Sequence, residues 1–229
     1  MNIRQMNTKT LYLSLVATTL LLASCGGKEN QKSETSTSAA QEVATVTDAD
    51  AVTLAIDPAQ SLVNWEGAKV VVDTKHVGSL GFLSGEVTGN AATGQILGGS
   101  FKVDMNSLVN FDQKGDMKTM LETHLKSADF FDVEKFPTST FVITSTEQQA
   151  EEGRYKISGN LTIKDKTNNI EFFATLRDDG AKYTAVTDTI TIDRTKWDIV
   201  YGSGQGLKEL TDKVIADPIS FVATVVAPK

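Results

Sequence analysis

The stretch HLKSADFFDVEKFPTSTF, residues 124–141, decides the fold because it places large apolar rings in a connection that normally holds polar side chains. Phe130, Phe131 and Phe136 alternate there with charged residues. Rings of this size are usually buried, so another part of the chain must cover them. The stretch begins as the end of a helix and continues as a strand after Pro137. It therefore predicts a helix that plugs or covers a sheet.

Short segments that alternate apolar with polar residues fill most of the remaining chain. In residues 99–105, Phe101 and Met105 fall on one face and Lys102 on the other. A period of two indicates half-buried strands. The predicted strands cover residues 62–65 continuing into 68–72, 76–82, 85–88, 99–105, 138–146, 155–163, 170–176, 183–192 and 219–226, with turns at 152–153, 167–169 and 178–180.

Residues 116–126 have a helical period instead. Their apolar residues recur at steps of three, one and four, which places them on one side of a helix. A second short helix is predicted for residues 207–214. So many strands with so few helices favour an antiparallel barrel or sandwich. We predict a mainly β fold, a single antiparallel eight-stranded β-barrel with one or two short helices.

The composition excludes several classes of function. The 229 residues carry 22 Lys and Arg against 29 Asp and Glu, a net charge of −7, so no basic surface for nucleic acid is expected. One Cys and two His cannot supply the four ligands of a structural zinc site, and one Cys forms no disulfide within the chain. We therefore expect no nucleic-acid partner and no metal.

The first 25 residues indicate export. Residues 1–24 contain Arg4 and Lys9 but no acid, and their apolar run, 11–23, is too short to span a membrane comfortably, as is typical of a signal peptide. The run ends in Leu-Ala-Ser-Cys-Gly, which resembles the lipobox of bacterial lipoproteins. The resemblance implies cleavage before Cys25 and lipidation of its thiol. The protein would then be anchored to the inner or outer membrane of the cell envelope, with its folded domain in the periplasm. An ordinary secreted protein is the alternative.

The segment that follows has a different composition. Residues 26–53 are rich in Gly, Ser, Thr, Ala, Gln and Glu and have no aromatic residue. Such a segment buries too little apolar area to offset the entropy of ordering it. We predict a signal peptide over residues 1–24, a flexible tether over 25–53 and a folded domain over 54–229.

Several segments together resemble the YceI-like family of bacterial secreted proteins, in the family's order and over residues 57–226. The resemblance implies a lipocalin-like barrel whose apolar interior holds a polyisoprenoid chain, such as the tail of an isoprenoid quinone. Many family members have a His-Ser pair after the first Asp, where this chain has Gln60-Ser61, so no head-group contact is carried over there. The segments are HLKSADFFDVEKFP at 124–137, GSFKVDM at 99–105, FPTSTF at 136–141, GNLTI at 159–163 and DRTKW at 193–197.

The large apolar residues of the predicted barrel are the candidates for a lumen. For each of them, core packing is the alternative to ligand contact, but a cleft of apolar groups with few polar ones suits a hydrophobic ligand. Lys69 and His76 are candidates for contact with a polar head group, and two solvated surface positions are the alternative. The lumen candidates are Trp65, Phe82, Phe101, Met105, Leu121, Leu125, Phe130, Phe131, Phe141, Phe172, Trp197 and Tyr201.

The two histidines are the candidates for catalysis. A Ser-His-acid hydrolase needs a nucleophilic serine, but the sequence has neither a G-x-S-x-G elbow nor another nucleophile motif. We expect His124 to bond a loop carbonyl or to interact with the helix dipole. Arg194 is expected to form a structural ion pair with an acid at the surface or rim.

The sequence therefore predicts a membrane-anchored lipoprotein that binds a long apolar lipid of isoprenoid type, as a carrier or buffer, without catalysing a reaction. A structural or interaction lipoprotein with a packed barrel is the alternative, and a hydrolase is the third hypothesis. The expected partners are the lipid and the membrane. No cofactor is predicted apart from the bound isoprenoid lipid. The oligomeric state is left open, with a dimer among the alternatives.

Overall fold

The computed structural model describes residues 35–71, 74–205 and 211–229, all within the compact unit Lys32–Lys229. These residues form eleven strands, one α-helix and one turn of 3-10 helix, so the predicted mainly β class is confirmed. The elements are β1 Thr37–Ala39, β2 Ala51–Ala55, β3 Leu62–Ala68, β4 Lys75–Asn90, β5 Ile96–Asn110, α1 Gly115–Lys126, β6 Thr138–Gln148, β7 Arg154–Ile163, β8 Lys166–Asp178, β9 Lys182–Thr187, β10 Ile190–Asp193, η1 Arg194–Trp197 and β11 Pro218–Pro228.

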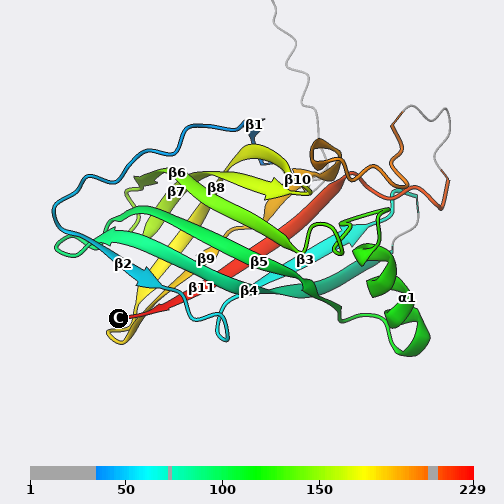
Figure 1. Cartoon of the computed structure of the whole chain (residues 1–229), viewed down its shortest axis with the longest axis horizontal. Helices are drawn as coiled ribbons and strands as arrows, with labels where there is room; N and C mark the ends of the chain where they lie inside the picture. The colour runs from blue at the N-terminus through cyan, green and yellow to red at the C-terminus, as the bar shows by residue number, and fades with distance from the viewer. Residues whose placement is uncertain (1–34, 72–73, 206–210) are drawn as a thin grey trace, which may run out of the picture. The chain divides into compact units, whose positions relative to one another are not determined.

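Eight of these strands close into an antiparallel barrel (Figure 1). From β3 to β8, each strand pairs with the next in sequence. β9 pairs with both β8 and β11, and β11 pairs with β3, which completes the circle. Closure of the sheet removes the free strand edges that a sandwich would keep. The predicted eight-stranded barrel is confirmed.

β4 changes its inward face along its length. Phe82 points into the barrel while Leu83 is half exposed. Between Phe82 and Ser84, two residues of β4 oppose one of β5, a β-bulge that shifts the alternation by one residue. Before this bulge the even-numbered residues, such as Phe82, face the cavity, and after it the odd-numbered residue Val87 does. The gap between the predicted strands 76–82 and 85–88 is therefore a bulge within one continuous strand.

The first described residues are attached to the barrel wall. The predicted strand 183–192 divides into β9 and β10; β10 continues along β11, and β1 takes the place beside β8. The N–H of Thr35 donates to the carbonyl of Thr191 on β10 at 2.7 Å. β2 pairs with the last residues of β4. The predicted flexible tether is therefore wrong for the part that contains β1 and β2, because their backbone groups are bonded to the barrel. Residues 25–34, Cys25 among them, lie outside the described residues.

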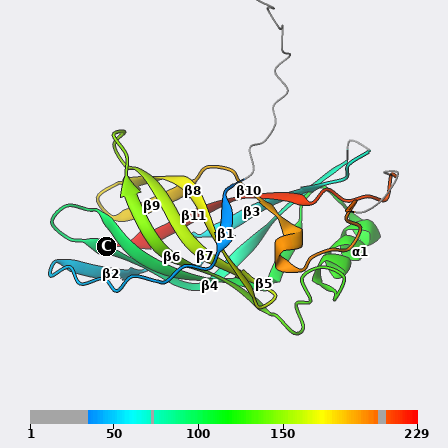
Figure 2. The same ribbon diagram turned by 90° about the horizontal axis from the view of Figure 1, so that it is seen from above.

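α1 agrees closely with the helix predicted over residues 116–126. Figures 1 and 2 both show it at one end of the barrel, after β5. The second predicted helix, 207–214, lies largely outside the described residues, and residues 211–214 include a turn rather than a helix. None of the helices in the described ranges is long and apolar enough to cross a membrane.

One predicted turn is displaced. Lys164 and Asp165 have φ values of 49° and 59°, and together they make the tight turn between β7 and β8. Two consecutive residues with positive φ are typical of a type I′ hairpin turn. Residues 167–169, predicted as the turn, therefore belong to β8. The sequence Thr-Asn-Asn has turn-like composition, but these residues pair as a strand with β7 and β1 instead.

Candidate functional site

A long cavity of about 790 Å³ runs inside the barrel. Its lining on β4 extends from His76 to Asn90, which corresponds to about 45 Å along a strand and about 35 Å along a barrel whose strands are tilted. Valine, leucine, isoleucine and phenylalanine side chains make up most of the lining. Small-molecule sites usually measure about 300–1,000 Å³. A cavity this long and apolar suits an extended hydrocarbon chain.

Four phenylalanine rings form a row across the middle of this cavity. The centroids of Phe82 and Phe101 lie 6.3 Å apart, those of Phe101 and Phe141 6.4 Å, and those of Phe141 and Phe172 5.5 Å. A Cβ on Gly159 would come within 2.2 Å of the Phe141 ring, so this glycine lets the ring lie against β7. Phe141 and Phe172 pack against both hydrophobic clusters of the core, which joins the two halves of the barrel interior.

The stretch that carries the aromatic residues lines the α1 end of the cavity. The His124 ring meets the Phe130 ring edge-on at 5.0 Å and the Tyr201 ring at 4.8 Å. Phe130 is buried in the core, and Phe131 is partly buried and packs against the same hydrophobic cluster. His124 Nε2 lies 3.1 Å from a carboxylate oxygen of Asp129, so its hydrogen-bond partner is an acid and not a loop carbonyl. Its place in the last turn of α1 agrees with the alternative, an interaction with the helix dipole. His124, Phe130, Phe131 and Tyr201 all line the cavity.

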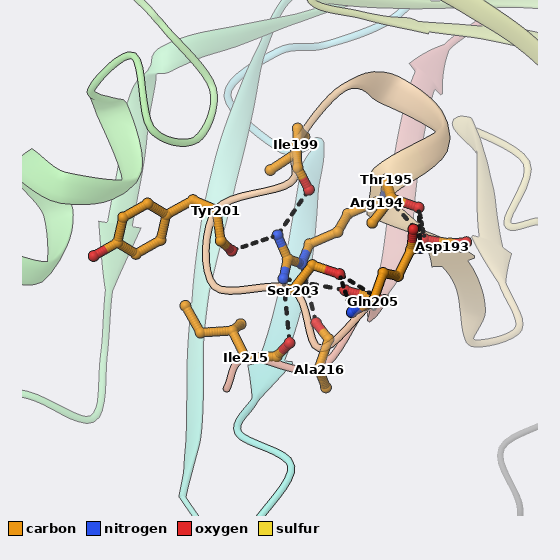
Figure 3. A network of polar contacts seen from close by, with 10 residues as sticks. Asp193, Arg194, Thr195, Ile199, Tyr201, Ser203, Gln205, Ile215 and Ala216 are labelled. Carbon is orange, nitrogen blue, oxygen red and sulfur yellow. Dashed lines mark hydrogen bonds and ion pairs between the residues drawn. The ribbon is translucent and has the colours of Figure 1, made fainter. Parts of the chain in front are cut away.

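Arg194 fixes the segment after η1 against the same end (Figure 3). Its side chain is 2% exposed, and burial lowers the pKa of its guanidinium from the ordinary value. The predicted ion pair exists, with Asp217 at 3.3 Å, but its guanidinium is buried rather than at the surface. The guanidinium also donates hydrogen bonds of 2.7–3.2 Å to the backbone carbonyls of Ile199, Tyr201, Ile215 and Ala216. Arg194 is therefore a positioning residue for the cavity-lining side chains of this segment.

His76 lies near the same end, on β4. Its Nδ1 is 2.8 Å from Asp112 Oδ2, and Asp112 Oδ1 accepts from the N–H of Val77 at 2.9 Å. Burial alone would raise the pKa of Asp112, but the hydrogen bonds from Val77, His76 and two neighbouring amides outweigh burial and hold the pKa well below its usual range. Among the described residues, the hydrogen-bond partner of each imidazole is thus a carboxylate and not the serine hydroxyl that a hydrolase needs.

Trp65 on β3 belongs to the cavity wall close to His76. A Cβ on Gly78 would come within 2.5 Å of the indole, so Gly78 leaves room for this ring. The indole N–H has no hydrogen-bond partner among the described residues, and less than 1 Å² of its nitrogen is exposed. An oxygen of a bound molecule reaches this nitrogen only if the ring turns. Trp65 therefore presents apolar surface to the cavity rather than a polar contact.

The structure places all but one of the predicted lumen residues on the cavity. Lys69 and His76 line it too, at the α1 end. Trp197 is the exception: it is fully buried, and its indole N–H donates to the Leu161 carbonyl at 3.0 Å. The prediction for Trp197 is wrong because η1 turns this side chain into the core beside β7. The residues that line the cavity as predicted are Trp65, Phe82, Phe101, Met105, Leu121, Leu125, Phe130, Phe131, Phe141, Phe172 and Tyr201.

Sequence reasoning missed many aliphatic lining residues. Val63, Ile143 and Leu80 lie on the cavity, each two positions from a predicted lumen residue on the same strand. Because side chains at i and i+2 of a strand share a face, this alternation was the signal that could have found them. Arg194 was missed as a buried lining residue because nothing in its local sequence indicates burial.

The barrel has relatives among known proteins. A UPF0312 protein of Staphylococcus aureus is 37% identical over 84 residues, which cover 34% of this chain and 46% of that protein. Protein YceI of Salmonella arizonae is 33% identical over 76 residues, or 33% of this chain and 39% of that one. The chain thus spans less than half the length of these curated relatives.

Solved structures share the fold. BcnA of Burkholderia cenocepacia matches with a TM-score of 0.59 at 23% identity, over 75% of this chain and 99% of that chain. A polyisoprenoid binding domain from Saccharophagus degradans matches with a TM-score of 0.54 at 12% identity, over 76% and 97%. The family profile of the YceI-like domain matches residues 54–227, which include nearly the whole barrel. This chain belongs to the YceI-like family.

Proposed function

We propose that the barrel binds a lipid with a long apolar tail, of isoprenoid or isoprenoid quinone type, and that the tail lies extended in the cavity. The continuous apolar cavity of about 790 Å³ is the observation that carries the proposal. Burial of the tail at about 25 cal/mol per Å² supplies the affinity. The similar domain from Saccharophagus degradans is a polyisoprenoid binding domain, which supports this class of ligand.

A binding role, as carrier or buffer, fits the lining better than a reaction does. The row of phenylalanine rings in the middle of the cavity has no polar group that could contact the lipid tail, and the charged lining residues lie toward the ends. A structural or interaction module would be favoured by a barrel filled with side chains. The open interior therefore supports the lipid binder over that alternative.

The second part of the proposal is the membrane anchor. The sequence around Cys25 indicates a lipidated N-terminus, and Thr35, the first described residue, is bonded to the barrel ten residues later (35 − 25). Ten extended residues reach at most about 35 Å. A chain lipidated at Cys25 would therefore be held close to a membrane of the cell envelope, with the barrel on the periplasmic side. The intact mass of the N-terminal peptide tests this anchor, because a Cys25→Ala variant should lack the acyl groups that the unchanged chain carries.

The bound ligand is identified on protein purified from the membranes of the cells that produce it. Native mass spectrometry should find a bound species of lipid mass, and solvent extraction should release one long isoprenoid lipid per chain. Preparations that are repeatedly empty, and that take up no isoprenoid lipid when it is offered, would exclude the proposal.

A further inference from the structure

The most exposed large apolar side chains of the described residues gather at one end of the barrel. They are Met120 (65% exposed), Met117 (61%), Phe111 (60%), Val200 (56%) and Val71 (53%), and we call them the rim. They come from the β3–β4 connection, from the segment between β5 and the end of α1, and from the segment after η1. Figures 1 and 2 both show these three segments at the α1 end.

Direct contacts hold the three segments together. The N–H of Val70 donates to the Val214 carbonyl at 3.0 Å, and the N–H of Phe111 donates to the Val77 carbonyl at 2.9 Å. The ring contact between His124 and Tyr201 joins α1 to the segment after η1. These contacts hold the three segments at the same end of the barrel, so the rim residues share that end. Single exposed apolar residues are common, but several at one end of a molecule are typical of an interaction site.

α1 contributes most to this surface. None of its residues is buried, although its sequence gives it an apolar side. Leu121 and Leu125 point to the cavity, whereas Met117 and Met120 are beside them and open to solvent. A surface helix normally buries its apolar stripe against the protein. In α1 the part of that stripe at Met117 and Met120 is exposed, with no cover from the rest of the described chain.

Exposed residues of the cavity lining, Tyr201 and Lys213, lie beside the rim, and we call this end of the cavity its mouth. Lys69 and Tyr201 line the cavity and are each within two residues of a rim residue in sequence. Lys213 lines it as well, and the bridge between Lys69 and Ile215 places the two lysines on the same side. Neither ammonium has a hydrogen-bond or ion-pair partner among the residues that the structure describes. Lysines interleaved with apolar side chains can extend their ammonium groups to the polar surface of a bilayer.

We propose that the rim docks on a lipid bilayer. Met117, Met120 and Phe111 enter the boundary between head groups and acyl chains, and the cavity mouth then opens onto the membrane. A lipid tail passes between bilayer and lumen without crossing water, which would otherwise oppose the transfer in proportion to the tail's apolar area. This inference rests on the proposed function, because it concerns the route of the lipid that the lumen binds.

The docking is tested on the unchanged full chain, added to phosphatidylcholine vesicles that contain phosphatidylcholine with a diazirine in its acyl chain. After photolysis, peptide mass mapping should find adducts on Met117, Met120 and Phe111. Leu83 and Phe173 are the controls, since they are exposed apolar residues on the outer wall of the barrel. Adducts missing from the rim, or equally frequent at Leu83 and Phe173, would overturn the proposal.

Transfer kinetics give a second readout. A Met117→Gln/Met120→Gln chain should take up a fluorescent geranylgeranyl lipid from vesicles about tenfold more slowly than the unchanged chain. Its equilibrium uptake from detergent micelles should stay the same, because neither methionine lines the cavity. The matched control, Leu83→Gln/Val186→Gln, should transfer at the normal rate. Equal rates in all three chains would refute docking.

The failure of docking and the failure of lipid binding are distinguishable. A chain that takes up no lipid even from micelles contradicts the proposed function, whereas the rim adducts still decide whether the surface docks. A concentration-dependent dimer that the Met117→Gln/Met120→Gln chain no longer forms would assign the rim to a second copy of the chain. That result would overturn the membrane assignment.

Discussion

An added ring at Ala185 should shorten the lumen. Ala185 lies on β9 and lines the cavity, with Leu176 and Val225 as its cross-strand neighbours on the same face. An Ala185→Phe side chain therefore projects into open space. A buried phenylalanine covers about 150 Å² or more, so it displaces a similar area of tail. At about 25 cal/mol per Å² the loss is about 4 kcal/mol for a tail that reaches this level, or roughly 500-fold in Kd.

The assay is a fluorescence titration with prenyl lipids of increasing length. Long tails should bind Ala185→Phe far more weakly than the unchanged chain, and tails too short to reach Ala185 from the α1 end should bind both chains equally. Val186→Phe is the matched control, because Val186 is the next residue on β9 and faces solvent. Equal affinity of all three chains for long tails would refute the placement of the tail in this half of the cavity.

Three further predictions concern stability. Arg194→Met leaves four backbone carbonyls and Asp217 without their guanidinium donor, so urea unfolding should show a loss of about 3–5 kcal/mol, and a loss below about 1 kcal/mol would contradict the network in Figure 3. The folded-state pKa of Asp112 is lowered, so its carboxylate contributes to the free energy of unfolding above about pH 4, and this contribution is lost as the pH falls further. Between about pH 4 and 2, the unchanged chain should therefore lose more stability than Asp112→Asn does. Parallel profiles of stability against pH for the two chains would argue against this. Phe130→Ala should cost about 3–5 kcal/mol because the ring is in the core, and Phe131→Ala should cost clearly less, with equal losses as the contrary result.

Most of the fold was predicted from the alternation of apolar and polar side chains along the chain. Period-two patterns depend only on the two faces of a strand, so they located the strands and, with their number, the barrel. The rings of Phe130 and Phe131 indicated a segment packed against the sheet, because so much apolar area requires cover. The Thr-Asn-Asn turn failed because turn composition is a local signal, whereas the pairing of β8 with β7 and β1 is a tertiary one.

The errors at the site have similar causes. Residues 37–39 and 51–55 have the composition of a tether, but free positions beside β8 and β4 give their backbones hydrogen bonds that the sequence does not reveal. Trp197 has the size of a lumen residue, yet a single 3-10 turn directs it into the core. Arg194 looks like a surface cation because its five acceptors come from residues 5 to 23 positions further along the chain.

The location of the tail is the central claim, and photo-crosslinking on β8 tests it most directly. Phe172 lines the cavity, and its neighbour Phe173 faces the outside of the same strand. A prenyl lipid with a diazirine at the tip of its tail should give adducts on cavity-lining residues such as Phe172, and these should disappear when unlabelled lipid competes. Adducts concentrated on Phe173 and the outer wall, with Phe172 unmodified, would contradict a lumen that holds the tail.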